Sequence, residues 1–508
     1  MQSIKTPIYQ AQQIREFERL AQERFSMTSQ ILMQRAGKAA FDFLQRRWPQ
    51  AHKIAVFCGG GNNGGDGYVL AAYAKERGMD VTIWQVGHQE KMKDTALAAQ
   101  QVCRQAKIPI YPFDENENLQ HPDVIVDAVC GIGIHQNLRD DIVAAIKKMQ
   151  RVHLPILSID LPTGIDADTG QILGAAVHAT ATITFIGLKL GLLTGSGIAC
   201  TGELICNDLQ LPTELFSYIQ PIAEKIHLSA YAPFLKPRSR DWHKGLSGHV
   251  LIIGGELGYS GAPRMAAEAA LRVGAGLVSV ATHPENAATL NIACPEIMCR
   301  GITNVDDLNV LINRANVIVL GPGLGQTEWA KMIWEHVTKL DLPIVLDADG
   351  LNLLSQTNLF HENWVLTPHP GEAARLIGVT SQEIQQDRLT ALKEINKRFG
   401  GVNVLKGAGS LVLAPNSLPA LCDKGNPGMA SAGMGDVLSG VIGGLIAQGI
   451  PLGDAAKMGV CMHAMAGDLA AKEGERGMIA MDLMPYLRRL SNQIGNQMGN
   501  QNQLSSQA

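Results

Sequence analysis

The stretch IAVFCGGGNNGGDGYVLAAYAKER, residues 54–77, decides the fold predicted for the first part of the chain. Its apolar run Ile54–Cys58 predicts a buried strand, and Asp66–Arg77 predicts a helix. In the glycine-rich turn between them, backbone N–H groups can approach a diphosphate, and the helix N-terminus adds positive potential. The stretch therefore predicts a strand–turn–helix unit that binds a nucleotide, with a tight structural turn as the alternative.

The same alternation continues on both sides of this stretch. Residues from about 10 to 48 have apolar positions at helical spacing and predict helices. The strands and helices predicted downstream are Val81–Val86, Thr95–Gln105, Val124–Val129, Asp140–Met149 and Ile156–Asp160, with a further strand at Thr182–Leu188. Continuous apolar strands that alternate with helices indicate an α/β domain with a parallel, doubly wound sheet.

The glycine pattern alone does not indicate a dehydrogenase. Gly59, Gly61 and Gly64 satisfy the spacing GxGxxG. A dehydrogenase with this fingerprint needs an acidic residue at the end of the next strand to hold the ribose. That strand ends Gln85-Val86-Gly87 without an acid. Hydride transfer is therefore disfavoured.

A second α/β domain is predicted after a break in the pattern. Between Leu211 and Trp242 the sequence carries proline and charge without periodicity, which places a domain junction near residue 225. The elements predicted beyond it are His249–Ile253, Ala262–Val273, Leu277–Ala281, Val317–Leu320, Ile344–Asp347, Trp364–Thr367 and Val402–Lys406. Domains are thus expected at residues 1–225 and 226–490, and the polar, Asn/Gln-rich residues 491–508 are expected to be disordered.

Composition excludes several classes of protein. The 508 residues hold 43 Lys and Arg against 47 Asp and Glu, so we expect neither a nucleic acid nor a membrane as a partner. The nine cysteines form no CxxC pair, which favours reduced, buried thiols over a disulfide framework or a zinc ribbon. The N-terminus lacks an apolar signal-peptide segment, and Val437–Ile450 is too short to span a bilayer. We expect a cytoplasmic protein.

Two acidic residues lie at or near predicted strand ends in the first domain. Asp127 precedes a Gly131–Gly133 turn and is either a hydrogen-bonded core group or a cation ligand. Together with Asn63 and Thr163 it offers hard oxygen donors, which suit an alkali or alkaline-earth cation and not zinc. Asp160 ends a central strand before a sharp turn, so it is a candidate acid–base group or, alternatively, a turn aspartate.

The strongest single signal in the second domain is NPGMASAGMGDVLSG, residues 426–440. Small residues before a helix form a nest of N–H donors for phosphate oxygens. Asp436, at the helix start, could take a hydroxyl proton as that oxygen attacks a phosphoryl group; the alternative is an ordinary N-capped helix. Lys406–Ser410 would add polyphosphate or ribose contacts. His369, beside two prolines at a strand end, is either a ligand contact or a structural histidine.

Three motifs of the first domain resemble the NAD(P)H-hydrate epimerase family: GGGNNGGDG (59–67), VDAVCGIG (126–133) and SIDLPTG (158–164). The proline usual in the first motif is replaced by Gly60, beside an intact Asn-Asn-Gly-Gly-Asp. The resemblance implies a potassium ion at Asn63, Asp127 and Thr163, and Asp160 as the catalytic acid–base residue. It implies contacts to a hydrated dinucleotide from Asn62, Asn63, Gly64, Gly65, Asp66, Gly131, Ile132, Gly133, Ile134, His135, Gln136, Asn137 and Asp160.

Five motifs of the second domain are similar to the ribokinase-like fold and, within it, to the nucleotide-dependent NAD(P)H-hydrate dehydratases: GYSGAP (258–263), GPGLG (321–325), TPHPGE (367–372), KGAGS (406–410) and AGMGD (432–436). Met434 departs from the small or hydroxyl residue of related kinases, but the backbone nest remains. The resemblance implies Asp436 as the catalytic residue and dinucleotide contacts from Ala262, Gly323, His369 and Asp436. It implies adenine-nucleotide contacts from Lys406, Gly407, Ala408, Gly409, Ser410 and Gly435.

Both resemblances together cover about residues 10–490 and point to the bifunctional NAD(P)H-hydrate repair family. They imply that a Rossmann-like first domain epimerises hydrated NADH and NADPH at C6. A ribokinase-like second domain would dehydrate the S form at the expense of ADP, with ATP left open as the donor. We also expect Mg²⁺ with the nucleotide and a homo-oligomer. The alternative is a ribokinase-like small-molecule kinase fused to a nucleotide-binding regulatory module.

Overall fold

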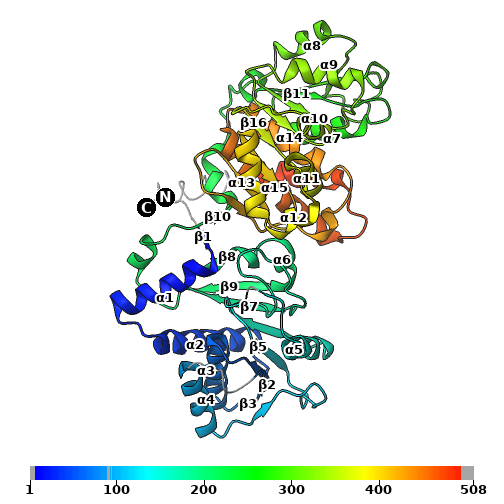
Figure 1. Ribbon diagram of the computed structural model, residues 1–508. Helices are drawn as coiled ribbons and strands as arrows, with labels where there is room; N and C mark the ends of the chain where they lie inside the picture. The colour runs from blue at the N-terminus through cyan, green and yellow to red at the C-terminus, as the bar shows by residue number, and fades with distance from the viewer. Residues whose placement is uncertain (1–5, 88–91, 93, 135, 493–508) are drawn as a thin grey trace. The chain divides into compact units, whose positions relative to one another are not determined.

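The computed structural model describes residues 6–87, 92, 94–134 and 136–492. The chain divides into two compact units, Pro7–Ala223 and a second one that runs from Glu224 onward and includes Thr6. The border lies just before the predicted junction, because Glu224 and Lys225 pair with a strand of the second unit. Each unit is an α/β structure, as the sequence predicts (Figure 1).

The first unit is built on a parallel sheet with the strand order β4-β3-β2-β5-β6-β7-β9. The strands are β2 (Lys53–Cys58), β3 (Asp80–Gln85), β4 (Ile110–Pro112), β5 (Val124–Ala128), β6 (Ile156–Ile159), β7 (Ala181–Phe185) and β9 (Glu203–Asn207), with a short parallel pair of β1 (Thr6–Tyr9) and β8 (Leu188–Lys189). From β2 the chain runs outward through β3 and β4 and then returns to β5, beside β2. Ligands bind beyond the carboxyl ends of the strands at such a reversal.

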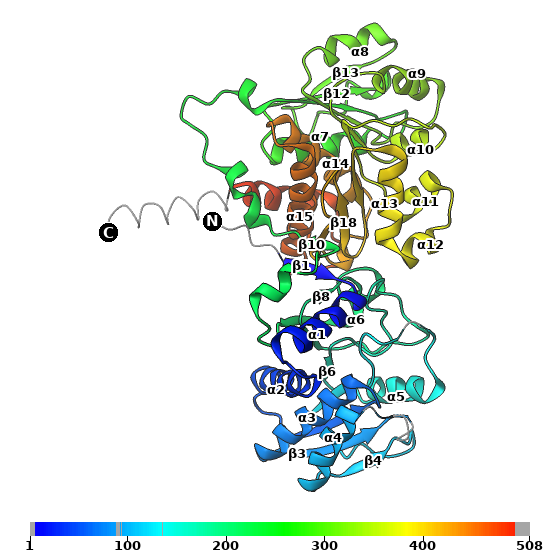
Figure 2. The ribbon, with the colours of Figure 1, turned by 60° about the vertical axis from the view of Figure 1, so that its left-hand side comes forward.

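Helices cover both faces of this sheet (Figures 1 and 2). They are α1 (Ala11–Phe25), α2 (Ser29–Arg47), α3 (Asn62–Glu76), α4 (Asp94–Gln105), α5 (Asp140–Arg151) and α6 (Gly195–Thr201). Along β2, Ile54, Val56 and Cys58 join the core beneath α1 to α4, whereas Ala55 and Phe57 join the core beneath α5. Both faces of the strand are buried, which explains its continuous apolar run and confirms the doubly wound sheet.

Helix α3 begins at Asn62, earlier than the predicted start at Asp66. Gly64 and Gly65, which were predicted to lie in the turn, are part of the first turn of the helix instead. Glycine is required in this part of the helix because a larger residue would clash with neighbouring atoms. A Cβ atom on Gly64 would lie 1.8 Å from the carbonyl oxygen of Gly59, and one on Gly67 would lie 2.5 Å from Cβ of Ala128. Tertiary packing therefore outweighs the low helix propensity of glycine.

The sheet of the second unit has the order β13-β12-β11-β14-β15-β16-β17-β18-β19-β10. The strands are β10 (Ala223–Lys225), β11 (His249–Ile253), β12 (Leu277–Thr282), β13 (Met298–Gly301), β14 (Val317–Leu320), β15 (Ile344–Leu346), β16 (Trp364–Leu366), β17 (Val402–Leu405), β18 (Ser410–Leu413) and β19 (Ala420–Cys422). The strands from β13 to β17 are parallel, as the predicted βα alternation implies, but β13 itself was not predicted. β18 pairs antiparallel with both of its neighbours, which the sequence analysis missed.

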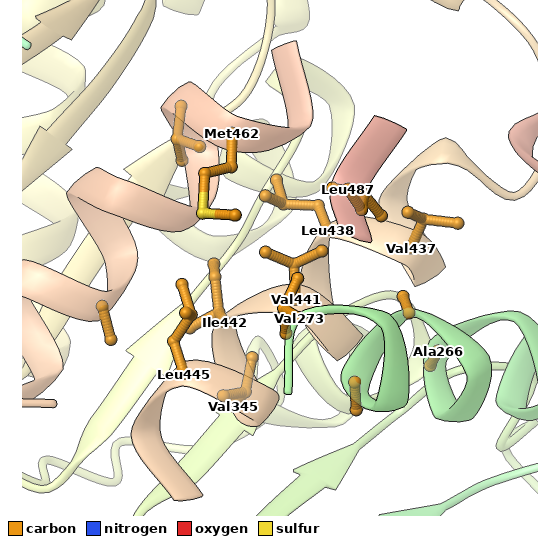
Figure 3. Packing of buried hydrophobic residues seen from close by; sticks show 14 of the residues in the cluster. Ala266, Val273, Val345, Val437, Leu438, Val441, Ile442, Leu445, Met462 and Leu487 are labelled. Carbon is orange, nitrogen blue, oxygen red and sulfur yellow. The ribbon is translucent and has the colours of Figure 1, made fainter. Parts of the chain in front are cut away.

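Helix α14 (Met434–Ala447) lies at the centre of the second core. The other helices are α7 (Gly261–Arg272), α8 (Val305–Ile312), α9 (Glu328–Val337), α10 (Asp349–Leu354), α11 (Pro370–Ile377), α12 (Ser381–Gln386), α13 (Arg388–Phe399) and α15 (Leu452–Ala470). Figure 3 shows apolar side chains of α14, among them Val441, beside Val273 and Met462. A Cβ atom on Gly440 would lie 2.0 Å from the carbonyl oxygen of Ala266. This close packing fixes the N-terminus of α14, where Asp436 lies.

The predicted disordered tail, residues 491–508, differs from the structure at its start. Residues 484–492 are helical, so the predicted tail 491–508 overlaps a helix at its start, and 493–508 lie outside the described residues. All nine cysteines are free thiols, and most are buried, as predicted. Within the described part of the chain, no helix combines the length and hydropathy needed to span a membrane.

Candidate active sites

The first candidate site is a pocket of about 570 Å³ beyond the carboxyl ends of β2, β5 and β6. The predicted substrate contacts that line it are Asn62, Asn63, Asp66, Gly131, Ile132, Gly133, Ile134 and Asp160. The predicted contacts that do not line it are Gly64, Gly65, Gln136 and Asn137, and His135 lies outside the described residues. The structure thus brings most of the three motifs of the first unit to one pocket.

Close backbone contacts hold the three loops of this pocket together. A Cβ atom on Gly59 would lie 2.0 Å from the carbonyl oxygen of Val129, so the loops after β2 and β5 touch. One on Gly131 would lie 3.1 Å from Oδ2 of Asp160 and 3.4 Å from Cβ of Asn63. Glycine at position 131 therefore lets the carboxylate of Asp160 and the side chain of Asn63 both lie close to the loop after β5.

Asp160 has an unusual backbone and an ion pair at the pocket wall. Its φ of 66° lies in the left-handed region, which is uncommon for a residue with a side chain. Its Oδ1 accepts hydrogen bonds from Nζ of Lys189 at 2.5 Å and from Oγ1 of Thr184 at 3.2 Å. Lys189 and Thr184 were missed by the sequence analysis, although Lys189 is the only charge in the apolar run Phe185–Leu193. That isolated charge was the signal available.

Asp66 places a second carboxyl in the same pocket. It is largely buried in the second turn of α3, and its exposed atoms face the pocket. Burial, followed by the negative charges of Asp160 and Glu18, raises the pKa of Asp66 well above its usual range. The pocket therefore combines a charge-paired carboxylate with a carboxyl that tends to keep its proton.

Asp127 and Thr163 form a buried hydrogen-bonded pair behind the pocket. Oδ1 of Asp127 accepts from Oγ1 of Thr163 at 2.6 Å, and Oδ2 accepts from the Thr163 backbone N–H at 2.8 Å and from Oγ of Ser158 at 2.8 Å. Asp127 is fully buried, which raises its pKa, and no ion pair to it is found within the described residues. All of these donors are neutral, so the carboxylate lacks a counter-charge from the described side chains.

The amide of Asn63 is the third member of the predicted cation set. It is buried, and neither its oxygen nor its nitrogen has a hydrogen-bond partner among the residues that the structure describes. Oγ1 of Thr163 accepts one hydrogen bond, from the backbone N–H of Cys130, which leaves it a second lone pair. An unpartnered amide oxygen, a hydroxyl oxygen and an uncompensated buried carboxylate fit a monovalent cation. The described residues contain no group of three or more His, Cys, Asp or Glu arranged for a metal ion.

The second candidate site begins where the loop after β11 and the first turn of α7, which carries Ala262, meet the loop after β14, which carries Gly323. The backbone N–H of Glu256 donates to the carbonyl of Gly323 at 2.7 Å. A Cβ atom on Gly323, whose φ is 57°, would lie 2.9 Å from Cβ of Tyr259 and 3.4 Å from Cβ of Ala262. The loops after β11 and β14 therefore meet, and both predicted contacts lie where they meet.

A charged cluster lies beside these loops at the ends of β15, β16 and β17. Nζ of Lys406 contacts Oδ1 of Asp347 at 2.7 Å and Oε2 of Glu372 at 3.7 Å. Burial lowers the pKa of Lys406, but the carboxylates of Asp347 and Glu372 outweigh it, so its pKa is raised. Burial, followed by the charge of Asp347, raises the pKa of Asp436 to about 7. Gly435 adjoins Lys406, because a Cβ atom there would lie 3.2 Å from Nζ.

His369 both caps helix α11 and reaches the cluster. Its Nδ1 accepts from the backbone N–H groups of Gly371 at 2.9 Å and Glu372 at 3.3 Å. Nε2 lies 3.4 Å from Oε1 of Glu372, and burial lowers the pKa of the imidazole. About half of the side chain is exposed. His369 therefore has a structural role as a helix cap, and the exposed half of its side chain can still contact a ligand.

Arg388 holds the backbone of the predicted nucleotide loop Lys406–Ser410 through hydrogen bonds to its carbonyl oxygens. It is fully buried, and its Nη2 donates to the carbonyl oxygens of Leu405, Lys406 and Gly409. Burial lowers the pKa of its guanidinium to about 10. Sequence analysis missed Arg388, and also Asp347 and Glu372 as partners of Lys406. No motif spacing links these residues, although the acid in the run IVLDADG (344–350) was a usable signal.

Two family models match the chain, one for each unit. The model described as YjeF-related protein N-terminus matches residues 29–191, and the one described as NAD(P)H-hydrate dehydratase matches residues 250–489. The solved structure of the hypothetic protein SMU.573 from Streptococcus mutans is 30% identical, with a TM-score of 0.50. It covers 53% of this chain and 99% of that chain.

Curated relatives match over nearly the full length of both chains. The bifunctional NAD(P)H-hydrate repair enzyme Nnr of Coxiella burnetii is 47% identical over 491 residues, which cover 96% of this chain and 100% of the relative. The enzyme of the same name from Escherichia coli is 44% identical over 494 residues, or 96% and 95% of the two chains. These matches confirm the predicted resemblance to the bifunctional NAD(P)H-hydrate repair enzymes, with a dehydratase domain in the second unit. The chain therefore belongs to the family of bifunctional NAD(P)H-hydrate repair enzymes.

Proposed function

We propose that Asp160 transfers the proton in the epimerase reaction and that Asp436 does so in the dehydratase reaction. The observation that carries the proposal is the position of these two acids: each comes from a sequence motif, follows a strand or begins a helix, and lies in or beside a candidate site. Asp160 has a strained backbone and a buried lysine partner. Asp436 has a pKa raised to about 7. A carboxyl with a raised pKa in a ligand site, such as Asp436, is a candidate catalytic group.

Epimerisation requires the C6–O bond of the hydrate to break and to form again on the other face of the ring. The lone pair of the ring nitrogen stabilises the cation formed when the bond breaks. In its protonated form, Asp160 would pass a proton to the departing oxygen as the C6–O bond breaks. The resulting carboxylate, paired with Lys189, would take a proton back from the water that adds to the other face. The N–H groups at the start of α3 and the turn Gly131–Ile134 would bind the diphosphate. These groups orient the ring toward Asp160.

A potassium ion is proposed for the epimerase site because the donor set fits one. Asn63, Asp127 and Thr163 would hold it through amide, carboxylate and hydroxyl oxygens. When bound, the ion supplies the positive charge that the buried Asp127 carboxylate lacks. Asp127 itself would keep the loops after β5 and β6 together through its bonds to Thr163 and Ser158.

Dehydration requires a better leaving group than hydroxide. Asp436 would accept the proton of the C6 hydroxyl while its oxygen attacks the terminal phosphoryl group of ADP, which releases AMP. Phosphate then leaves from C6, and loss of a proton from C5 restores the dihydropyridine. Lys406–Ser410 and Gly435 would contact the nucleotide. Ala262, Gly323 and His369 would contact the hydrated dinucleotide.

A Mg²⁺ ion with the nucleotide is also part of the proposal. Asp347, Glu372 and Asp436 offer the hard carboxylate oxygens that such an ion prefers, next to the predicted phosphate loop. When bound, the ion neutralises charge on the phosphate oxygens. ADP as the donor, a homo-oligomeric state and a cytoplasmic location likewise remain predictions.

The decisive experiment is incubation of the full chain with an epimer mixture of hydrated NADH, with and without ADP and Mg²⁺. We expect the near-ultraviolet absorbance of the dihydronicotinamide to recover completely, with one phosphate released for each ring restored. Without nucleotide, the ratio of epimers should equilibrate while the absorbance stays low. A stable phosphorylated product without recovery of absorbance would instead indicate a small-molecule kinase.

Epimerisation is expected to depend on potassium through Asn63. Replacing K⁺ by N-methylglucamine should slow the wild type, and adding K⁺ should restore it. Asn63→Ala should need roughly tenfold more K⁺ for the same rate, because a lost contact around a bound metal typically weakens binding by 10–100-fold. Asn116→Ala, in an exposed loop, is the matched control. An unchanged K⁺ requirement in Asn63→Ala would remove Asn63 from the cation set.

Dehydration is expected to slow in acid with a midpoint near pH 7. A general base acts only when it is deprotonated. The pKa of Asp436 is raised to about 7, so in the free enzyme its carboxylate becomes protonated as the pH falls through about 7. The value of kcat/KM for the S hydrate should therefore be about tenfold lower at pH 6 than at pH 8. Initial rates at low hydrate concentration give the profile. A flat profile down to pH 5 would argue against Asp436 as the base.

The two activities are expected to separate when the chain is cut just before β10. Glu224 and Lys225 pair with β19, and Nζ of Lys225 contacts Asp423 at 2.5 Å, so β10 must stay with the second unit. Residues 1–221 should equilibrate the epimers without nucleotide, and residues 222–508 should dehydrate only the S form. Cutting after residue 225 should give a less stable second fragment, measured by thermal unfolding. Loss of both activities in both pairs of fragments would show that the units depend on each other.

A further inference from the structure

Lys189 is a buried lysine whose ammonium group meets three acceptors at the wall of the epimerase pocket. Nζ lies 2.5 Å from Oδ1 of Asp160, 2.8 Å from Oγ1 of Thr184 and 2.8 Å from the carbonyl oxygen of Phe185. An ammonium has three N–H donors, so each can be used. The side chain is 0% exposed. Asp160 is therefore its counter-ion, and the ammonium cannot turn away from it.

The two carboxylate oxygens of Asp160 have different surroundings. Oδ1 accepts from both Lys189 and Thr184. Oδ2 accepts no hydrogen bond within the described residues and lies toward Gly131, on the pocket side. The side chain is 13% exposed, and Asp160 is among the residues that line the pocket. One oxygen is thus anchored while the other is presented to the pocket.

The anchor is needed because the backbone at Asp160 is strained. A left-handed φ of 66° costs free energy at a non-glycine residue and persists only when the surroundings enforce it. The backbone N–H of Asp160 donates to the carbonyl of Ile183 at 2.7 Å, and its carboxylate is tied to Lys189 and Thr184. A buried ion pair contributes little to stability compared with an apolar pair of the same shape. Stability alone therefore does not account for the pair, which points to a role in the pocket.

We propose that Lys189 is a positioning residue for epimerisation, which holds Oδ1 of Asp160 and so aims Oδ2 at the C6 hydroxyl of the hydrate. The proposal rests on the proposed role of Asp160 as the proton-transfer group. Lys189 itself exchanges no proton with the substrate, because its three N–H groups are occupied by protein acceptors. Thr184 assists, since its hydroxyl contacts both members of the pair.

The test compares Lys189→Met, Asp160→Asn and the double variant in the full chain. With excess ADP, the S hydrate is consumed first, and the slower consumption of the R hydrate then reports epimerisation. Lys189→Met keeps the length of the side chain and removes the charge. We expect its kcat for the R hydrate to fall by roughly 10²-fold, the effect of a misplaced catalytic group, with KM changed by less than about twofold. In the Asp160→Asn background, Lys189→Met should cost nothing further, because it acts through Asp160.

Two further variants keep the test decisive. Lys38→Met removes a lysine that pairs with Asp42 on the exposed face of α2, and it should leave epimerisation unchanged. Thr184→Val removes only the shared hydroxyl and should lower kcat by about tenfold at constant KM. This variant tests the proposal if Lys189→Met fails to fold.

Three outcomes would overturn the proposal. The first is a kcat of Lys189→Met for the R hydrate within about threefold of wild type. If Lys189→Met does not fold, the corresponding outcome is a kcat of Thr184→Val equal to that of wild type. The second is an equal loss from Lys189→Met in both backgrounds, with KM raised, which would indicate collapse of the pocket. The third is a fully active Asp160→Asn, which would also reject the proposed function. A slow Asp160→Asn beside a fast Lys189→Met rejects the role of Lys189 alone.

Discussion

The Asp160→Asn variant is expected to lose epimerisation by roughly 10²–10⁴-fold and to dehydrate the S hydrate at the wild-type rate. Asparagine has the shape of aspartate, and its amide oxygen can still accept the hydrogen bond from Lys189. Diphosphate binding should therefore survive while proton transfer does not. The other unit carries the dehydratase motifs, so its rate should not change. With excess ADP, the absorbance should recover quickly for the S hydrate and then stop short, because the R hydrate is no longer converted.

The matched control for this variant is Asp166→Asn in the loop that follows. Oδ1 of Asp166 accepts from the backbone N–H groups of Asp168 and Thr169 and from Oγ1 of Thr169, which is the pattern of a turn aspartate. Asparagine can accept the same bonds, so epimerisation should stay at the wild-type rate. A loss below about tenfold in Asp160→Asn would reduce Asp160 to a turn residue as well, since general acid–base groups contribute far more.

The parallel core of both units could be predicted because its strands are buried on both faces. A run such as Ile54–Cys58 is apolar at every position because both of its faces are buried, so its composition alone predicts a buried strand. The edge and hairpin strands could not be found in the same way. In β9 no residue is fully buried, and β18 and β19 form an antiparallel hairpin within a domain where only parallel strands were expected. Short strands of this kind are specified by their neighbours more than by their own sequence.

The acids of both candidate sites could be predicted because each ends a strand or begins a helix within a motif. Their partners could not. Lys189 follows Asp160 by a whole strand and a turn, and Asp347 lies far before Lys406 in the chain. Only the parallel sheet brings such residues to one edge, so no spacing in the sequence encodes the pair. The predicted contacts Gln136 and Asn137 fail to line the pocket for the related reason that a turn directs few of its residues inward.

The charge balance at Asp436 explains why its substitution should separate binding from chemistry. Asp436 lies near the carboxylates of Asp347, Glu372 and Asp349, and Lys406 is the cation that offsets them. Removing one negative charge from this group reduces its repulsion toward a polyphosphate. The Asp436→Asn variant should therefore bind ADP as well as wild type or slightly better, as measured by calorimetry. It should lose dehydration by roughly 10²–10⁴-fold, because no carboxylate remains to take the hydroxyl proton.

Asp436→Glu is the sharper companion because it keeps the charge and moves the carboxylate by one methylene. The N-terminus of α14 is fixed by its contact with α7, so the longer side chain cannot be accommodated by a shift of the helix. The proton acceptor is misplaced, which can cost roughly 10²-fold, while the repulsion toward nucleotide remains. Both variants should be slow, and only Asp436→Asn should show relieved repulsion, so it should bind ADP at least as tightly as wild type. Asp454→Asn, at the same position in the first turn of α15, should change neither property. Near-normal turnover by Asp436→Asn at saturating ADP would assign proton removal to another group.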